Sequence, residues 1–160
     1  MTYTILDSPC GPLTAVSDGA ALVALSFGEC PPSGAENGND MIIDSLAGQL
    51  DGYFAGSRRA FDVPLKLYGA VFDQAVWAAL ASIPYGKIIT YGALASAIGK
   101  PNACRAAGGA CGRNPVVIVI PCHRVLGAGN GPWRKRLTGF GGGLAAKTML
   151  LELEEKFYNA

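Results

Sequence analysis

The residues best suited to chemistry are Cys122 and His123, which are neighbours within the segment Pro121-Cys122-His123-Arg124. His123 is the only histidine in the chain. A thiolate is a strong nucleophile, and a nearby base or cation favours its formation. The segment therefore predicts an activated thiol. A buried structural cysteine stays open as the alternative, because free cysteines commonly have that role and sequence neighbours seldom face each other.

The segment before this pair is strongly apolar. Residues 116–120 are five consecutive β-branched residues, which favour a buried, extended conformation. The sequence therefore predicts a buried strand that ends at Pro121 and presents Cys122 at its end.

Two short helices are predicted ahead of this strand. Thr90 is a suitable N-cap for a helix over 91–98, and Asn102 for a second helix over 103–111, with Gly99-Lys100-Pro101 between them. Such a pair indicates a helix-turn-helix. A preceding helical face runs from Phe72 to Ile83.

The second short helix consists almost wholly of small residues. Arg105 is its only long side chain, and Gly108 and Gly109 each cost about 1 kcal/mol relative to alanine inside a helix. This composition indicates that another surface approaches the helix closely. Packing against a neighbouring helix and contact with DNA explain it equally well.

The first half of the chain has a different pattern. Short strands are predicted over 2–6, 13–16 and 21–27, with a loop over 30–40 and an extended piece over 61–67. Asp40 is a suitable cap for a helix over 41–54, whose apolar residues recur at helical spacing. Strands followed by a helix favour a small α+β domain.

Charge is divided unevenly along the 160 residues, although the net charge is only +1. Residues 1–73 hold nine acidic and three basic residues, whereas residues 74–151 hold nine basic residues and no acidic one. Residues 152–160 add three acidic residues and one basic residue. A basic second half favours a polyanionic partner.

Composition excludes several classes of protein. Half of the residues are hydrophobic and 16% are charged, which excludes a disordered polyelectrolyte. No apolar run is long enough to span a membrane, and no secretory signal is visible. The five cysteines form no CxxC pair, so we expect no metal site, no disulfide framework and a cytoplasmic location.

With these motifs in place, the sequence resembles the O6-alkylguanine-DNA alkyltransferases, the methylated-DNA–protein-cysteine methyltransferases. The segments that carry the resemblance span residues 69–156. They are Ile83-Pro84-Tyr85-Gly86, Thr90-Tyr91-Gly92, Arg105-Ala106-Ala107-Gly108, Arg113-Asn114-Pro115, Ile120-Pro121-Cys122-His123-Arg124-Val125, Leu137-Thr138-Gly139-Phe140-Gly141-Gly142-Gly143-Leu144 and Leu150-Leu151-Glu152-Leu153-Glu154.

The resemblance implies a catalytic set. Cys122 would accept the alkyl group from guanine O6 in one irreversible turnover, with O4-methylthymine as a further expected substrate. His123 would take the thiol proton, Glu154 would orient His123, and Tyr91 would donate a proton to the leaving base. No cofactor is implied.

The resemblance also implies binding residues. Asn114, Val125, Gly141 and Phe140 would form the base pocket, with Phe140 at a position where the family commonly has tyrosine. Duplex DNA would bind through its minor groove, without sequence specificity and with the damaged base flipped out. The expected DNA contacts are Ala103, Arg105, Gly108, Gly109, Arg113, Arg124, Arg134, Lys135 and Arg136.

The implied fold is α+β, with a ribonuclease H-like scaffold over 1–68 and a mostly helical, winged helix-turn-helix domain over 69–160. We expect a monomer in the absence of DNA. The segment 126–136 is longer than expected for the family, and we hypothesise that it adds a DNA backbone contact. Two other functions stay open, a DNA-damage sensor or regulator without transfer chemistry and a thiol hydrolase.

Overall fold

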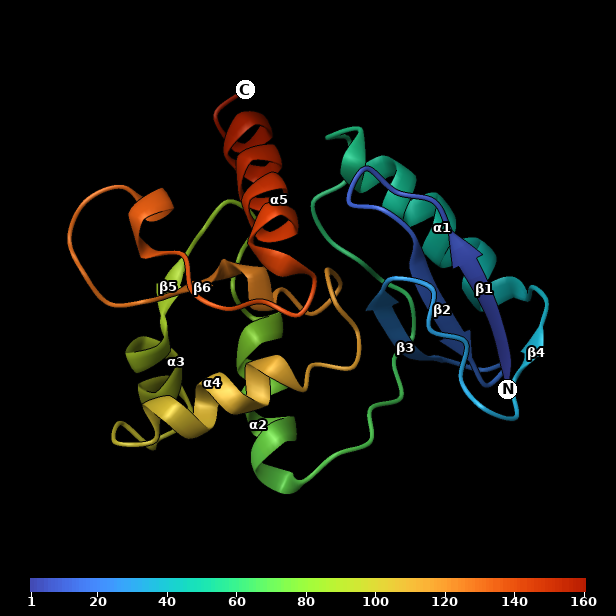
Figure 1. Ribbon diagram of the computed structural model, residues 1–160, viewed down its shortest axis with the longest axis horizontal. Helices are drawn as coiled ribbons and strands as arrows, with labels where there is room; N and C mark the ends of the chain where they lie inside the picture. The colour runs from blue at the N-terminus through green and yellow to red at the C-terminus, as the bar shows by residue number, and fades with distance from the viewer. The chain divides into compact units, whose positions relative to one another are not determined.

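The computed structural model describes all 160 residues, which form two compact units (Figure 1). Unit 1 comprises residues 1–68 together with 115–117, and unit 2 comprises residues 69–114 and 118–160. None of the helices is long and apolar enough to cross a membrane.

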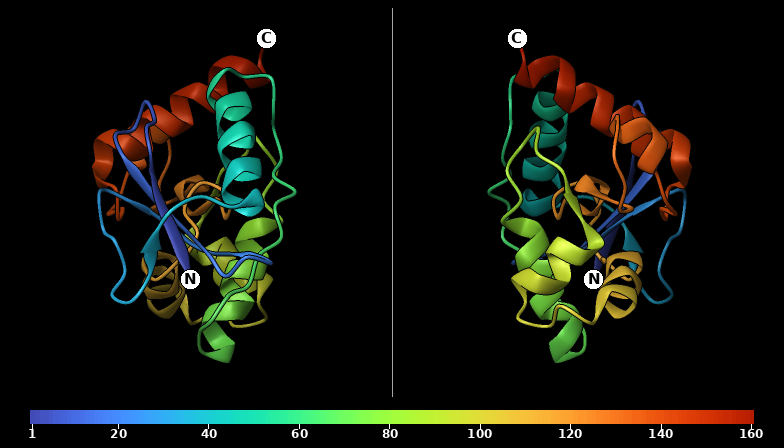
Figure 2. Two further views of the ribbon diagram at one scale, coloured as in Figure 1. Left: turned by 90° about the vertical axis from the view of Figure 1, so that its right-hand side faces the viewer. Right: turned by 90° about the vertical axis from the view of Figure 1, so that its left-hand side faces the viewer.

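Unit 1 is a four-stranded sheet with one helix. The strands are β1 (Thr2–Leu6), β2 (Leu13–Ser17), β3 (Leu22–Phe27) and β4 (Glu36–Asn37), in the order β3-β2-β1-β4. The first three pair antiparallel, and β4 pairs parallel with β1. Helix α1 (Met41–Phe54) lies along one face of this sheet (Figures 1 and 2). The predicted α+β arrangement is confirmed, although β4 falls within the segment that was expected to be only a loop.

The N-terminus of α1 is fixed by Asp40, as the sequence predicts. Its Oδ1 accepts hydrogen bonds from the backbone N–H groups of Ile42 and Ile43 at 3.0 and 2.9 Å. The apolar face of the helix then buries Ile43, Leu46 and other residues that recur at helical spacing.

Unit 2 is mostly helical. Its helices are α2 (Val71–Ala81), α3 (Tyr91–Ala97), α4 (Cys104–Gly112) and α5 (Gly143–Tyr158), with short 3-10 turns η1 (Cys122–Arg124) and η2 (Trp133–Arg136). Strands β5 (Ile89–Thr90) and β6 (Val125–Leu126) pair parallel. Helix α4 packs against α2 and α3, and the indole N–H of Trp77 donates to the Ala110 carbonyl at 2.9 Å. The predicted helix-turn-helix is therefore present as α3 and α4.

The two expected caps of this pair have different outcomes. Thr90 accepts a hydrogen bond from the Ala93 backbone N–H at 3.1 Å, which confirms it as the cap of α3. The prediction for Asn102 was wrong, because α4 begins after Ala103 and has no side-chain cap. The N–H of Ala103 instead donates to the Lys100 carbonyl in the preceding turn, at 2.9 Å.

The predicted strand over 116–120 was also wrong. Val116 forms a single bridge with Leu25, and the chain then turns at Ile118, which has a φ of +70°. This left-handed conformation is strained for a β-branched residue. Burial of the Val116, Ile118 and Ile120 side chains holds the turn in place, and the chain reaches Cys122 four residues later.

The two capping positions provide a test of helix stability. We expect Asp40→Ala to lower the free energy of unfolding by about 1 kcal/mol, because two N–H groups of α1 lose their acceptor. Asn102→Ala is the matched control and should stay within about 0.5 kcal/mol of the parent chain. Urea unfolding measures both, and an equal effect of the two substitutions would contradict the assignment of the caps.

Candidate active site

Cys122 begins η1, four residues after Ile118, and its side chain is buried. Asn114, two residues after the end of α4, holds the thiol of Cys122 in position. The Nδ2 of Asn114 donates to Cys122 Sγ at 3.1 Å and to the Ile120 carbonyl at 2.8 Å. The same amide thus holds both the thiol and the backbone that leads to it.

His123 and Glu154 are brought together from η1 and α5. Nε2 of His123 lies 2.8 Å from Oε1 of Glu154, and both side chains are buried. Burial lowers the pKa of His123, although Glu154 opposes this shift, so the imidazole is neutral at pH 7. The carboxylate selects the tautomer with hydrogen on Nε2, which leaves a lone pair on the buried Nδ1.

Arg124 also binds Glu154, in the bidentate geometry that guanidinium and carboxylate groups favour. Its Nε and Nη2 lie 2.9 and 2.8 Å from the two carboxylate oxygens, and Nη1 donates to the Ile83 carbonyl at 2.6 Å. Arg124 is only 6% exposed. The expectation that it contacts DNA was therefore wrong, because its charge is buried and already paired.

Glu154 remains ionised in this network. Burial alone would raise its pKa, but hydrogen bonds from His123 and Arg124, together with the charge of Arg124, lower it to about 2. The backbone N–H of Gly86 adds a further contact at 3.3 Å.

Lys147 is a second buried cation near the thiol. Its side chain is fully buried, and Nζ donates to the Val125 carbonyl at 2.6 Å. The carbonyl expected to contact the base is thus already bound by Lys147, and Val125 itself is fully buried. Burial lowers the pKa of Lys147, and the nearby Cys122 and Cys111 oppose that shift.

The thiol faces a small pocket of about 110 Å³. The pocket is lined by Tyr91, Gly108, Cys111, Gly112, Cys122, Gly139, Phe140 and Gly141. Of the expected base-contacting residues, Phe140 and Gly141 therefore line the pocket. Burial raises the pKa of Cys122, while the Asn114 hydrogen bond and the Lys147 ammonium oppose the rise. Burial, with a smaller effect of Cys122, raises the pKa of Cys111 to about 12.

An open groove adjoins the pocket, and the two share Tyr91, Gly108 and Gly139. Cys104, Arg105 and Thr138 complete the lining of the groove. The exposed face of α4 therefore leads to the thiol, and Arg105 stands on it. Of the other small residues expected to contact DNA, Gly109 is exposed and Ala103 is half-buried.

Arg113 occupies the C-terminal end of α4. Its guanidinium binds the carboxylate of Asp73 with two hydrogen bonds of 2.8 Å, while 59% of its side chain stays exposed. This pairing joins α2 to α4, so the expected phosphate contact would have to compete with Asp73.

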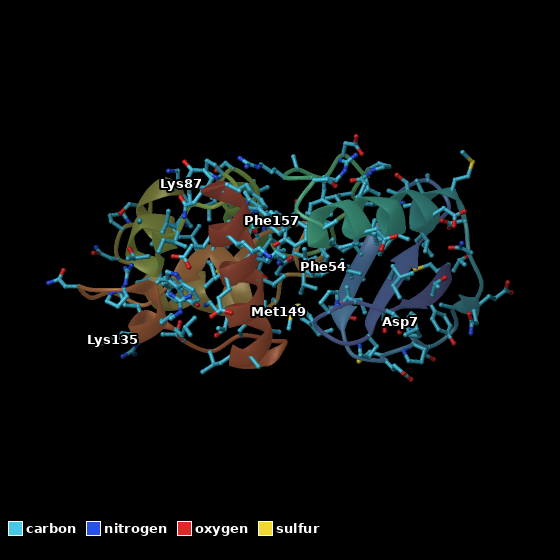
Figure 3. All side chains as sticks on the ribbon, turned by 90° about the horizontal axis from the view of Figure 1, so that it is seen from above. Asp7, Phe54, Lys87, Lys135, Met149 and Phe157 are labelled. Atoms are coloured by element: carbon cyan, nitrogen blue, oxygen red, sulfur yellow. The ribbon has the colours of Figure 1, made fainter.

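The basic segment 134–136 lies in the loop over 127–136, beside α5 (Figures 1 and 2). Arg134 forms ion pairs with Glu152 and Glu155 of α5 at 3.4 and 3.3 Å. Arg136 is half-buried, whereas Lys135 is exposed and its side chain points away from the rest of unit 2 (Figure 3). Lys135 is thus the member of this segment best placed to meet a phosphate.

Sequence reasoning missed Lys147, Cys111 and Thr138. A signal for Lys147 existed, because it shares the buried stripe of α5 with Leu150, Leu151 and Glu154 at helical spacing. Neither Cys111 nor Thr138 had a distinguishing pattern. No group of His, Cys, Asp and Glu side chains in the structure is arranged to hold a metal ion.

Comparison with known proteins places both parts of the chain in one family. Residues 71–156 match the family described as "6-O-methylguanine DNA methyltransferase, DNA binding domain", and residues 1–67 match its "ribonuclease-like domain". A methylated-DNA–protein-cysteine methyltransferase of Mycobacterium bovis is 45% identical, with 96% of this chain and 92% of the relative covered. One from Methanosarcina acetivorans is 44% identical, with 96% and 98% covered.

The fold gives the same result. The crystal structure of Mycobacterium tuberculosis OGT in complex with DNA matches with a TM-score of 0.89 at 42% identity, covering 98% of this chain and 94% of that one. An O6-methylguanine DNA methyltransferase of Methanococcus jannaschii matches with a TM-score of 0.64 at 26% identity, covering 94% and 92%.

The buried carboxylate gives a test of the network. We expect Glu154→Gln to cost about 3–5 kcal/mol in the free energy of unfolding, because the buried charge of Arg124 loses its partner. Glu155→Gln, an exposed neighbour on the same helix, should cost less than about 1 kcal/mol. Denaturant unfolding at pH 7 compares the two variants.

The contribution of Glu154 to stability depends on pH. The pKa of Glu154 is about 2 in the folded chain and about 4.3 in the unfolded chain. The ionised carboxylate therefore stabilises the fold at pH values above about 4.3, and this contribution is lost as pH falls towards 2. The difference in the free energy of unfolding between the parent chain and Glu154→Gln should therefore become smaller as the pH is lowered. A difference in the free energy of unfolding that stays constant from pH 7 to pH 3 would contradict the ionised state of Glu154.

Proposed function

Because this chain belongs to the methylated-DNA–protein-cysteine methyltransferase family, we propose that it repairs DNA by moving the alkyl group of O6-alkylguanine irreversibly onto Cys122. The observation that carries the proposal is the buried thiol of Cys122, which Asn114 holds at a small pocket and which precedes the paired His123 in the chain. The nucleophile is thus followed directly in the chain by a base that contacts a carboxylate able to orient it.

Activation of the thiol begins at His123. Glu154 holds hydrogen on Nε2, so the buried Nδ1 is the basic nitrogen and takes the thiol proton through a bridging water. The Asn114 amide and the Lys147 ammonium stabilise the resulting thiolate, because both lower the pKa of Cys122 against the effect of burial.

Transfer then occurs by in-line displacement. The Cys122 sulfur forms a bond to the alkyl carbon as the bond between that carbon and guanine O6 breaks. Tyr91, which lines the pocket with Cys122, donates a proton to a ring nitrogen so that guanine leaves as a neutral base. The product is a thioether, and since nothing in the pocket reverses it, each molecule acts once.

Substrate contacts come from the loop that closes the pocket. Gly141 offers a backbone N–H and no side chain, the ring of Phe140 stacks on the base, and the Val125 carbonyl accepts from it through its remaining lone pair. Phe140 lacks the hydroxyl of the tyrosine common at this position, and stacking does not require that hydroxyl. O4-methylthymine is a further proposed substrate of the same pocket.

DNA is the partner of unit 2. We infer that α4 enters the minor groove, because its exposed surface carries only small side chains besides Arg105 and leads to the pocket. Arg105 fills the space left by the flipped base. Phosphate contacts from exposed cations such as Lys135 bind without regard to sequence, as repair requires.

Residues 1–68 serve as a scaffold, and residues 69–160 bind DNA and accept the alkyl group. The chain acts as a monomer in the absence of DNA, and in the cytoplasm. The segment 126–136 adds a backbone contact through Lys135, whereas Arg134 is held by α5.

Intact-mass measurement tests the reaction. After incubation with duplex DNA containing O6-methylguanine, the chain should gain one methyl group, on the peptide with Cys122. Cys122→Ala should gain none, while Cys111→Ala and Cys104→Ala should still be methylated. Binding without an adduct would indicate a damage sensor, and repeated turnover of an ester or amide would indicate a thiol hydrolase.

Lys147 gives a test of thiolate stabilisation. We expect Lys147→Met to slow single-turnover transfer at neutral pH by about tenfold, because the pKa of Cys122 rises when the nearby ammonium is removed. The pH–rate profile should shift to higher pH, so that the deficit shrinks as pH increases. A slower reaction with an unshifted profile would contradict this role.

A further inference from the structure

The hydroxyl of Thr138 meets the phenol of Tyr91, a contact that the mechanism above does not use. Oγ1 of Thr138 lies 3.2 Å from the Tyr91 hydroxyl oxygen and donates to it. Both side chains line the open groove that adjoins the pocket of Cys122. The contact therefore lies where a flipped base would pass on its way to the thiol.

The backbone around Thr138 is held by the loop before it. The N–H of Gly127 donates to the Arg136 carbonyl at 2.9 Å and closes the loop at its base. A Cβ added at Gly127 would lie 3.0 Å from the methyl group of Thr138, so a side chain there would push Thr138 away. The Arg134 ion pairs anchor the same loop to α5. The Thr138 hydroxyl is thus directed to Tyr91 by packing on its other side.

A phenol has one hydrogen to donate, and its oxygen also accepts. When Thr138 donates to that oxygen, the Tyr91 hydrogen cannot point back at Thr138 and is left for another acceptor. Donation to the phenol also makes it a better proton donor. Burial raises the pKa of Tyr91, and the hydrogen bond from Thr138 opposes that rise.

We propose that Thr138 is a positioning residue for alkyl transfer, which orients the Tyr91 hydroxyl so that its hydrogen faces the leaving base. The inference rests on the proposed role of Tyr91 as the proton donor. It gives a role to Thr138, the residue that packs against Gly127 at the base of the loop over 127–136.

Single-turnover transfer from duplex DNA containing O6-methylguanine tests the inference in four variants. Thr138→Val keeps the shape and removes the donor, and it should slow transfer about three- to tenfold with unchanged DNA affinity. Thr138→Ser keeps the donor and should stay within about twofold of the parent chain. In the Tyr91→Phe background, Thr138→Val should add no further loss, since the group that it positions is gone.

Three results would overturn the inference. The first is an unchanged rate in Thr138→Val when Tyr91→Phe alone is slow. The second is an equal further loss in the Tyr91→Phe background, which indicates a purely structural effect. The third is an unchanged rate in Tyr91→Phe itself, which would show that Tyr91 is not the proton donor. Intact-mass measurement of Cys122 methylation separately shows whether the proposed transfer reaction takes place. Thermal unfolding of each variant confirms that the fold is intact.

Discussion

Unit 2 depends on the burial of the Glu154 carboxylate. Removing a carboxylate from water costs several kcal/mol, which only close and well-oriented donors can offset. Here His123, the Nε and Nη2 groups of Arg124 and the Gly86 backbone N–H supply them. Because these donors come from η1 and from the turn after α2, one charge on α5 connects the elements around the Cys122 thiol. Gly86 itself has a φ of +74°, and a Cβ there would lie 2.5 Å from the Tyr158 ring, so the turn requires glycine.

The charge of Glu154 would disfavour a thiolate if it acted alone. Arg124 removes this effect, because its guanidinium neutralises the buried carboxylate. His123 can then use Glu154 as an orienting partner while Lys147 supplies the net positive charge near Cys122. The two buried cations therefore have different tasks. Arg124 compensates a carboxylate, and Lys147 favours a thiolate that burial alone would disfavour.

Local signals explain which parts of the fold could be predicted. The strands of unit 1, helix α1 with its Asp40 cap and helix α3 with its Thr90 cap follow from periodicity and capping chemistry within a few residues. The segment 116–120 could not be predicted in this way. Its β-branched residues favour a strand, but tertiary packing holds Ile118 in a left-handed conformation that turns the chain instead.

In the site, too, some residues could be predicted from the sequence and others could not. The Cys122–His123 motif and the resemblance led to the contact of His123 with Glu154, which lies 31 residues further along the chain. Arg124 was misjudged because residue type alone does not show whether a cation is buried. Lys147 was missed for the converse reason, since a lysine within an apolar stripe can be read as an exposed neighbour of that stripe.

Burial also changes what the charge division along the chain means. Nine basic residues and no acidic one between residues 74 and 151 suggest a strongly positive surface. In the structure, however, Arg124 and Lys147 are buried, and Arg113 and Arg134 are paired with carboxylates. The positive charge at the surface therefore comes from fewer groups, among them the exposed Arg105 and Lys135. Arg113, Arg124 and Arg134 instead join helices through carboxylates that lie outside this stretch of the chain, and Lys147 lowers the pKa of the Cys122 thiol against the effect of burial.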